Sequence, residues 1–379
     1  MLNLLHALTA GCAFFLSFLV FSVRMDTNTV ANRWLAAFLC LLGFFMIDDS
    51  LAVFGIYRQY PWLYGYPSLA TFALAPTLFL CVTHFVSVDK RFKRSELWHF
   101  APFGLFCLLS LPFLLSGNAV KMKAIDDLGG PFDPVDHVML GMVLAQVISY
   151  WLLSLLKLLK HRKNIGQITA SPAEFNLDWL LWVLYGIGAM ILIWMMDLWY
   201  YTLVLDATPA TPVYLVLIGW LGYFALRQKE IYPFTQAEAE AVDEIMTGNS
   251  ELTTLARRPM FSEEKLELLK KRLLEKMEHE KPYLDPDINL PELAGYMQLS
   301  VHEMSQLVNE GFAENFAQFI NRYRVEESKR LLLSDKYAHL NMVGIAYEAG
   351  FNSKTAFNTV FKKLTGVSPS AFRNNQGEV

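Results

Sequence analysis

Residues 345–369 read IAYEAGFNSKTAFNTVFKKLTGVSP, and this stretch decides the fold of the C-terminal part of the chain. Apolar residues at helical spacing predict two helices. The second is expected to bury Phe357, Val360, Phe361 and Leu364. Gly350 lies between the helices, where a tight turn needs a positive φ, and Asn352 or Ser353 is placed to cap the second helix. A helix, a tight turn and a capped helix make up the helix-turn-helix pattern.

The same pattern occurs about 52 residues earlier in the chain. The segment Leu293 to Leu299 mirrors residues 345–351. Ser300 and Glu303 then have the spacing of a capping box, which predicts a helix that buries Met304, Leu307 and Val308. A long helix from about Phe316 to Ser334 is expected to join the two units.

The second helix of each unit leaves polar side chains on its open face. An α-helix fits the major groove of DNA, where polar side chains contact base edges, so these side chains are the predicted DNA contacts. They are His302, Ser305, Gln306 and Asn309 in the first unit, and Lys354, Thr355, Asn358, Thr359, Lys362 and Lys363 in the second. Plain solvent exposure is the alternative for each of them taken singly.

Charge is unevenly distributed over the two units. From Arg322 to Arg373 nine basic residues face four acidic ones, a net charge of +5, whereas residues 261–321 are net acidic. Because Lys and Arg neutralise phosphates, DNA affinity is expected to depend mainly on the second unit and the connecting helix.

These motifs together resemble the DNA-binding domain of AraC/XylS-family regulators over residues 280–373. The resemblance is carried by Ile345-Ala346-x-x-x-Gly350-Phe351, by the run from Phe357 through Phe361-Lys362-Lys363, Gly366 and Ser368-Pro369 to Arg373, and by Arg324-Val325-Glu326-Glu327-Ser328-Lys329-Arg330-Leu331-Leu332. It implies two recognition helices in successive major-groove segments on one face of the DNA. It also suggests dimerisation and activation through RNA polymerase.

Departures from the family pattern lie mainly in the first unit. Gln306 stands where the family commonly has Arg, Val308 where it has Phe, and Ala313 where it has Gly. Ser328 replaces the usual Ala, and Gln298 occupies the turn position that Gly350 holds in the second unit. These departures leave the expected fold intact and put the base preference of the first unit in doubt.

The N-terminal part consists of long apolar runs of the length that a bilayer-spanning helix needs, about 20 residues. Seven spans are predicted: Leu2–Val23, Trp34–Ile56, Tyr66–Val86, Trp98–Leu115, Val138–Leu159, Trp179–Leu203 and Pro212–Leu226. Lys and Arg gather in alternate loops, around residues 90–94 and 157–163, and after residue 226. By the positive-inside rule the N-terminus is outside and the C-terminus inside, as a DNA-binding tail requires.

Four ionisable residues lie within these spans, near the predicted outer face: His6, Asp48, Asp49 and Asp197. Such groups are costly in a bilayer and are functional candidates by default. They predict an outward-facing polar pocket for a signal molecule. Capping of helix ends, or pairing with hydroxyl groups across helices, is the alternative.

An apolar stripe at helical spacing follows Ser262. It comprises Leu266, Leu268, Leu269, Leu273, Leu274 and Met277. This helix is either the first of the globular domain or a dimerisation and signal-transmitting helix. No HExxH, GxSxG or Gly-rich phosphate motif is present, and the four cysteines have no metal-site spacing, so we expect no enzymatic activity, cofactor or metal.

The sequence therefore predicts an all-α protein with a seven-helix transmembrane sensor domain over 1–227, a linker over 228–261 and an AraC-type domain over 262–379. The predicted function is a membrane-anchored, sequence-specific transcription regulator, multi-pass in the bacterial cytoplasmic (inner) membrane. Double-stranded DNA and the lipid bilayer are the expected partners. RNA polymerase, a small-molecule ligand and a second copy of the chain are further candidates.

Two alternatives stay open at this point. In the first, the N-terminal part is a transporter or a membrane enzyme, and the DNA-binding domain is an attached regulator. In the other, proteolysis in the linker releases the DNA-binding domain from the membrane.

Overall fold

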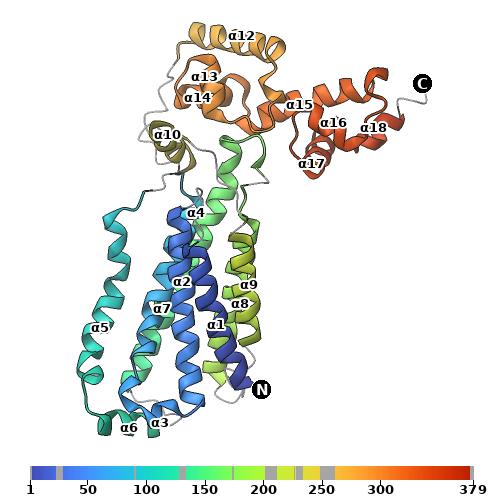
Figure 1. Cartoon of the computed structure of the whole chain (residues 1–379). Helices are drawn as coiled ribbons and strands as arrows, with labels where there is room; N and C mark the ends of the chain where they lie inside the picture. Colours follow the sequence, from blue (N-terminus) through green and yellow to red (C-terminus); the bar gives the residue numbers. More distant parts are fainter. Residues whose placement is uncertain are drawn as a thin grey trace. The chain divides into compact units, whose positions relative to one another are not determined.

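The chain divides into two units in the computed structural model (Figure 1). Unit 1 comprises residues 1–159 and 177–230, and unit 2 comprises residues 160–176 and 231–379. The structure describes residues 2–22, 29–88, 91–127, 134–172, 175–200, 211–225, 227, 234–247 and 261–375. Most of the predicted linker 228–261 lies outside these residues.

Unit 1 is built from apolar helices joined by short connections. Its longer helices are α1 (Leu2–Ser22), α2 (Thr29–Val53), α4 (Ala70–Val86), α5 (Ala101–Leu114), α7 (Pro134–Asn164, the last turn of which belongs to unit 2), α8 (Asp178–Tyr200) and α9 (Thr211–Ala225). Shorter elements are α3 (Ile56–Gln59), α6 (Asn118–Asp126) and the 3-10 turns η1 (Pro61–Leu63), η2 (Pro67–Leu69) and η3 (Arg94–Phe100).

Five helical segments in the described residues are long and apolar enough to cross a membrane, so the predicted count of seven was wrong. They are Leu4–Ser22, Thr29–Val53, Pro61–Val86, Arg94–Leu114 and Val138–Gln167. The sixth and seventh predicted spans correspond to shorter apolar stretches, Asp178–Ile193 and Pro212–Ala225. Within the described residues, Pro212–Ala225 is shorter than the stretch of about 20 residues needed to cross the hydrocarbon core, whereas helix α8 as a whole, Asp178–Tyr200, reaches that length.

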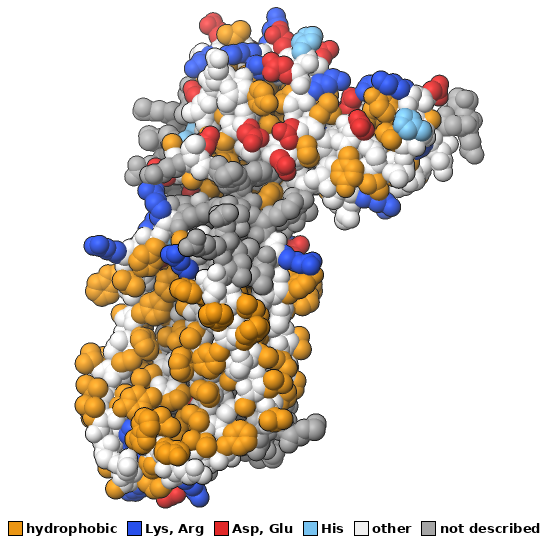
Figure 2. Space-filling view, in the orientation of Figure 1, with side chains coloured by type: hydrophobic (Ala, Val, Ile, Leu, Met, Phe, Trp, Pro, Cys, Tyr) orange, Lys and Arg blue, Asp and Glu red, His pale blue; other side chains and the backbone are white. Residues whose placement is uncertain are grey.

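Apolar side chains occur both inside unit 1 and on its outer surface. Helix α2 packs between α1 and α4, and Leu35, Leu39 and Leu42 of α2 are buried in the core. The outer side of α1 exposes Phe15, Phe18 and Phe21. Figure 2 shows hydrophobic side chains over most of the visible face of this unit. An apolar exterior of this extent is typical of a surface that contacts lipid or protein.

Unit 2 is a set of amphipathic helices. They are α10 (Gln236–Thr247), α12 (Glu263–His279), α13 (Leu290–Met297), α14 (Val301–Phe312), α15 (Phe316–Leu332), α16 (Met342–Glu348), α17 (Lys354–Thr365) and α18 (Pro369–Asn375). The 3-10 turns η6 (Pro282–Leu284) and η7 (Asp335–Tyr337) lie between them, and η4 (Ile165–Gln167) follows α7 in the segment 160–176 that belongs to unit 2. Charged side chains of both signs mark the visible face of this unit in Figure 2.

The helical periodicity of the sequence identified most of the buried positions of unit 2. Helix α12 buries Leu269, Leu273 and Met277 and packs against α14 and η6, as the first helix of the globular domain would. Leu268 and Leu274, assigned to the same stripe, are exposed by 66% and 42%. Leu364, predicted to be buried in α17, is 52% exposed and lies one residue before that helix ends at Thr365.

Candidate nucleic-acid interface

The first helix-turn-helix unit consists of α13, a tight turn and α14. Asn289 caps α13, its side chain accepting from the Glu292 amide while the Glu292 carboxylate accepts from the Asn289 amide. Gln298 makes the turn in the left-handed conformation, at φ 56°, although glycine is the residue that adopts it most readily. Ser300 then caps α14 in the predicted box with Glu303. The caps fix where α14 begins.

The second unit repeats this arrangement with α16 and α17. Asn341 caps α16 by accepting from two amides, and Ser353, one of the two predicted caps, accepts from the Ala356 amide at the start of α17. Gly350 has φ 86° in the turn, as predicted. A β-carbon there would lie 2.4 Å from the carbonyl oxygen of Tyr283, so the backbone of η6 packs directly on this glycine.

The connecting helix α15 carries one fully buried cation, Arg324. Its Nε donates to the Tyr283 carbonyl at 2.8 Å and its Nη2 to the Asp285 carbonyl at 2.7 Å. The guanidinium also lies 5.8 Å from the centre of the Phe351 ring. Arg324 therefore ties α15 to the segment before α13 and to the turn before α17. The expectation that it contributes charge for DNA was wrong.

The predicted contact residues differ in exposure between the two recognition helices. On α17, Lys354, Thr355, Asn358, Thr359, Lys362 and Lys363 are all exposed. On α14, His302, Ser305 and Gln306 are half-buried, and Asn309 is exposed. Both sets lie on the helix face opposite the core, because Met304, Leu307, Phe357 and Phe361 point inward and are fully buried. Each helix thus presents one continuous polar stripe.

The half-burial of the α14 stripe has a local cause. His302 Nε2 lies 3.2 Å from Glu244 Oε2 of α10, and α10 packs against α14. Gln306 donates to Glu310 at 2.7 Å, while its Oε1 is buried and accepts no hydrogen bond within the described residues. Helix α10 lies within the segment 228–261 that the sequence predicts as a linker, so this contact was not predicted.

Most cations of the connecting helix are paired within the unit, so the net charge of +5 overstates the charge free for DNA. Arg322 makes a bidentate contact with Glu314, donating from Nε to Oε1 and from Nη2 to Oε2, both at 3.0 Å, a pairing that raises the Arg322 pKa. Lys329 pairs with Glu326 at 2.7 Å. Arg330 pairs with Glu327, and its hydrogen bond lowers the pKa of that carboxyl.

The lysines of α17 are in a different situation. Lys354, Lys362 and Lys363 are exposed, and they form no ion pair within the described residues. Arg373 in contrast donates to the carbonyl oxygens of Ala338 and Leu340, at 2.7 and 3.1 Å. The cationic surface available to phosphates is therefore concentrated on α17.

In unit 1 the structure brings three of the four predicted ligand residues together. The Asp48 carboxylate accepts from Ser68 at 2.6 Å and from the Tyr57 hydroxyl. Asp49 interacts electrostatically with His6, which is buried. Asp197 lies on α8, and its side chain is outside the described residues. Hydroxyl pairing, the alternative considered for this cluster, accounts for Asp48.

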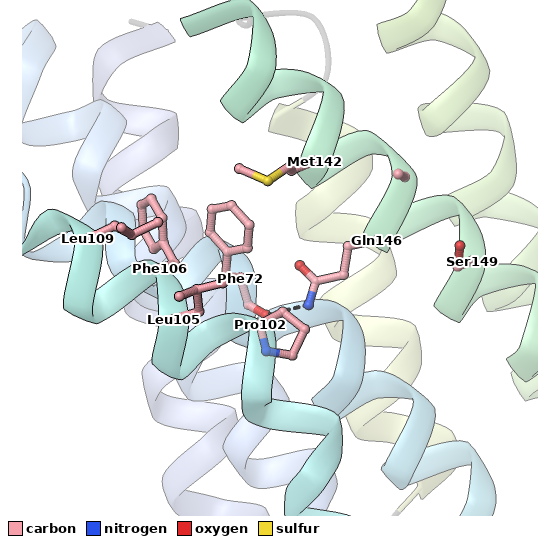
Figure 3. A pocket seen from close by; sticks show the side chains of 9 residues that line it. Phe72, Pro102, Leu105, Phe106, Leu109, Met142, Gln146 and Ser149 are labelled. Carbon is pink, nitrogen blue, oxygen red and sulfur yellow. Dashed lines mark hydrogen bonds between the residues drawn. The ribbon is translucent and has the colours of Figure 1, made fainter. Parts of the chain in front are cut away.

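A cavity of about 400 Å³ lies elsewhere in unit 1, between α4, α5 and α7 (Figure 3). Its lining is apolar except for Gln146 and Ser149, and the lining residues do not include His6, Asp48 or Asp49. Gln146 donates to the Phe72 carbonyl at 3.0 Å. Pro76, four residues on in α4, has no amide hydrogen for that carbonyl.

Two capped helix-turn-helix units on one connecting helix define the C-terminal part of unit 2 as a helix-turn-helix domain of the AraC type. Residues 293–375 match the protein family described as "Helix-turn-helix domain".

Relatives resemble the chain over this domain. An uncharacterized HTH-type transcriptional regulator of Staphylococcus aureus (strain MSSA476) is 30% identical over 90 residues, which make up 24% of this chain and 12% of that protein. The uncharacterized transcriptional regulatory protein YesN of Bacillus subtilis (strain 168) is 33% identical over 75 residues, or 20% of each chain. The chain thus spans well under two thirds of the length of these relatives.

A solved structure is similar to 28% of the chain. It is the crystal structure of the C-terminal domain of the two-component response regulator yesN from Fusobacterium nucleatum subsp. nucleatum ATCC 25586. It is 28% identical, covers 28% of this chain and 95% of that chain, and has a TM-score of 0.24.

Proposed function

We propose that the chain is a membrane-anchored, sequence-specific transcription regulator that binds DNA with α14 and α17 and responds to a signal sensed by unit 1. The observation that carries the proposal is the pair of capped recognition helices, each with one polar stripe opposite a buried core. Such helices contact base edges in the major groove. The apolar exterior of unit 1 supports a membrane location with unit 2 in the cytoplasm.

On α17 the exposed polar residues divide by chemistry. Asn358 can form two hydrogen bonds with adenine, a pairing that discriminates against the wrong base by about 1–3 kcal/mol. Lys362 and Lys363, one helical turn further on, suit phosphates. Lys354, Thr355 and Thr359 complete this surface, and His302, Ser305, Gln306 and Asn309 form the corresponding surface on α14.

The test is capture of genomic DNA fragments of the host by the full chain in phospholipid nanodiscs, followed by sequencing. Asn358→Ala should relax base preference at one position, with a loss of about 1–3 kcal/mol. Asn374→Ala, which truncates an exposed asparagine on α18, is the matched control and should leave the preference unchanged. A wild-type chain that enriches no sequence over input contradicts the proposal.

Sensing by unit 1 has its own test at Asp49. Asp48 already holds Tyr57 and Ser68, so its replacement disturbs the fold, and Asp49→Asn is the cleaner change. If unit 1 is a sensor, the Asp49→Asn variant loses its transcriptional response and keeps its DNA binding. Loss of substrate flux with an intact response would instead support the alternative of a transporter or membrane enzyme. A small-molecule ligand, dimerisation and contact with RNA polymerase belong to this proposal.

A further inference from the structure

Helix α10 is an acidic amphipathic helix that precedes the helix-turn-helix domain. Its sequence QAEAEAVDEIMT contains four carboxylates and no basic residue. Val242 is completely buried and Met246 nearly so, which shows that one face of α10 is packed. Its other side carries the acidic residues.

Helix α10 packs against the first recognition helix. Glu244, on the acidic side of α10, meets His302 at 3.2 Å. Gln306 follows His302 by one helical turn and so lies on the same face. Its Oε1 is buried and has no hydrogen-bond partner within the described residues, as expected of a base-contacting amide that is covered by a group other than a DNA base. Helix α10 therefore lies over the His302 end of the α14 surface proposed for base contacts.

This position of α10 and a DNA-bound α14 exclude each other. The major groove is about 12 Å wide, and an α-helix with its side chains is about 10–12 Å across. The groove thus admits α14 alone. The four carboxylates of α10 would also face phosphates, whose negative charge makes their approach unfavourable.

A loop between two apolar helices of the chain holds α10 in place. Residues 160–176, the last turn of α7 and most of the loop that leads to α8, belong to unit 2. Asn164 donates to the Met246 carbonyl at 2.6 Å, in the last turn of α10, where carbonyls have no partner within the helix. The same loop accepts from the Leu290 amide through Ile168, at 2.8 Å, and from Asn321 of α15 through Ala170, at 2.9 Å.

We infer that α10 is an autoinhibitory cover on the base-contacting face of α14, and that the α7–α8 loop is the latch that keeps it closed. The inference rests on the proposed DNA-binding function. Displacement of α7 relative to α8 pulls on residues 160–176, releases α10 and frees α14 for the groove. DNA affinity then depends on the fraction of molecules in which α14 is uncovered.

The experiment measures binding of the full chain, in phospholipid nanodiscs, to a pool of random duplexes of about 40 base pairs, enough for two successive groove segments. Glu244→Gln removes the negative charge that faces His302 and should raise affinity by up to about fivefold, the range of an exposed ion pair. Glu280→Gln makes the same charge change at a similarly exposed glutamate, 48% against 53%, and corrects for general repulsion.

Two further variants act on the packing and on the latch. Val242→Asp places a charge in the buried face of α10 and should raise affinity on the order of tenfold, the gain expected if the wild type is covered about nine-tenths of the time. Asn164→Leu should raise it in the same direction by loosening the latch. Hydrogen exchange of residues 301–309 should become faster in both variants, while exchange of 354–365 stays unchanged.

The outcomes separate the two ideas. Equal DNA affinity in the wild type, Glu244→Gln, Asn164→Leu and Val242→Asp overturns the autoinhibitory role and leaves DNA binding intact. Weaker binding in Glu244→Gln than in Glu280→Gln also overturns it, because α10 would then assist DNA binding. If neither the wild type nor any variant binds a duplex, the proposed function itself fails.

Discussion

Replacement of Arg324 by methionine should open the helix-turn-helix domain locally, because this one side chain fastens three segments. Its two short hydrogen bonds, to the carbonyls of Tyr283 and Asp285, each contribute about 1.5–3 kcal/mol when one partner is charged. Methionine keeps most of the apolar stem and leaves both carbonyls without a donor. Relief of the cost of burying the charge offsets part of the loss.

The net loss expected for Arg324→Met is therefore about 3 kcal/mol, or an opening equilibrium shifted by about 100-fold. Native-state hydrogen exchange of the full chain in nanodiscs measures it, through the amides of α15 and α16 that are protected only while this contact holds. Arg322→Met, two residues away, is the matched control. Arg322 is 40% exposed and pairs with Glu314, so its loss should cost less than about 1 kcal/mol.

Exchange rates that change by the same factor in the two variants would refute the argument. They would mean that the carbonyls of Tyr283 and Asp285 find water as soon as Arg324 is removed. The segment before α13 would then be held by its apolar contacts alone, with Tyr283 buried and stacked on Tyr323.

Three further predictions follow from the same unit. Gly350→Ala should destabilise unit 2 by about 2–5 kcal/mol, because a β-carbon at this positive φ would lie 2.4 Å from backbone. Gly295→Ala, in open space on α13, should stabilise unit 2 by up to about 1 kcal/mol. The denaturant midpoints of the two variants test both expectations. Lys362→Gln should lower the slope of log affinity against log salt by about 1, and an unchanged slope would remove Lys362 from the phosphate contacts. Hydrogen bonds from Ser300 lower the Glu303 pKa. The stability that Glu303 contributes is therefore present above its unfolded pKa of about 4.3 and is lost as pH falls through the folded pKa. Glu303→Gln should abolish this acid sensitivity of the denaturant midpoint.

Local signals made the helix-turn-helix domain predictable from the sequence. Caps at Ser300 and Ser353 and the turn glycine Gly350 act within a few residues of themselves, so the pattern specifies them directly. Gln298 and Ala313 are also in the left-handed conformation, at φ 56° and 55°. At both positions the sequence has a residue other than glycine, which is the residue that usually indicates this conformation.

Long-range contacts were not predictable in the same way. In the sequence, Arg324 cannot be told apart from an exposed arginine of a basic helix. Only its burial and its hydrogen bond to the Tyr283 carbonyl reveal its role. The Glu244–His302 contact joins residues 58 positions apart, and no periodicity relates them. The count of apolar spans differed at the sixth and seventh predicted stretches, whose described apolar segments are Asp178–Ile193 and Pro212–Ala225.

The two recognition helices are prepared differently for DNA, and this difference bears on the order of events. Helix α17 exposes Lys354, Lys362 and Lys363 without ion pairs among the described residues, whereas α14 lies beside the carboxylates of α10. Phosphate contacts give affinity and little sequence information, while base contacts give specificity. If α10 covers α14, α17 can hold the chain on DNA before α14 is free. Release of α10 would then add the second set of base contacts, so that a signal changes which sequences are bound as well as how tightly.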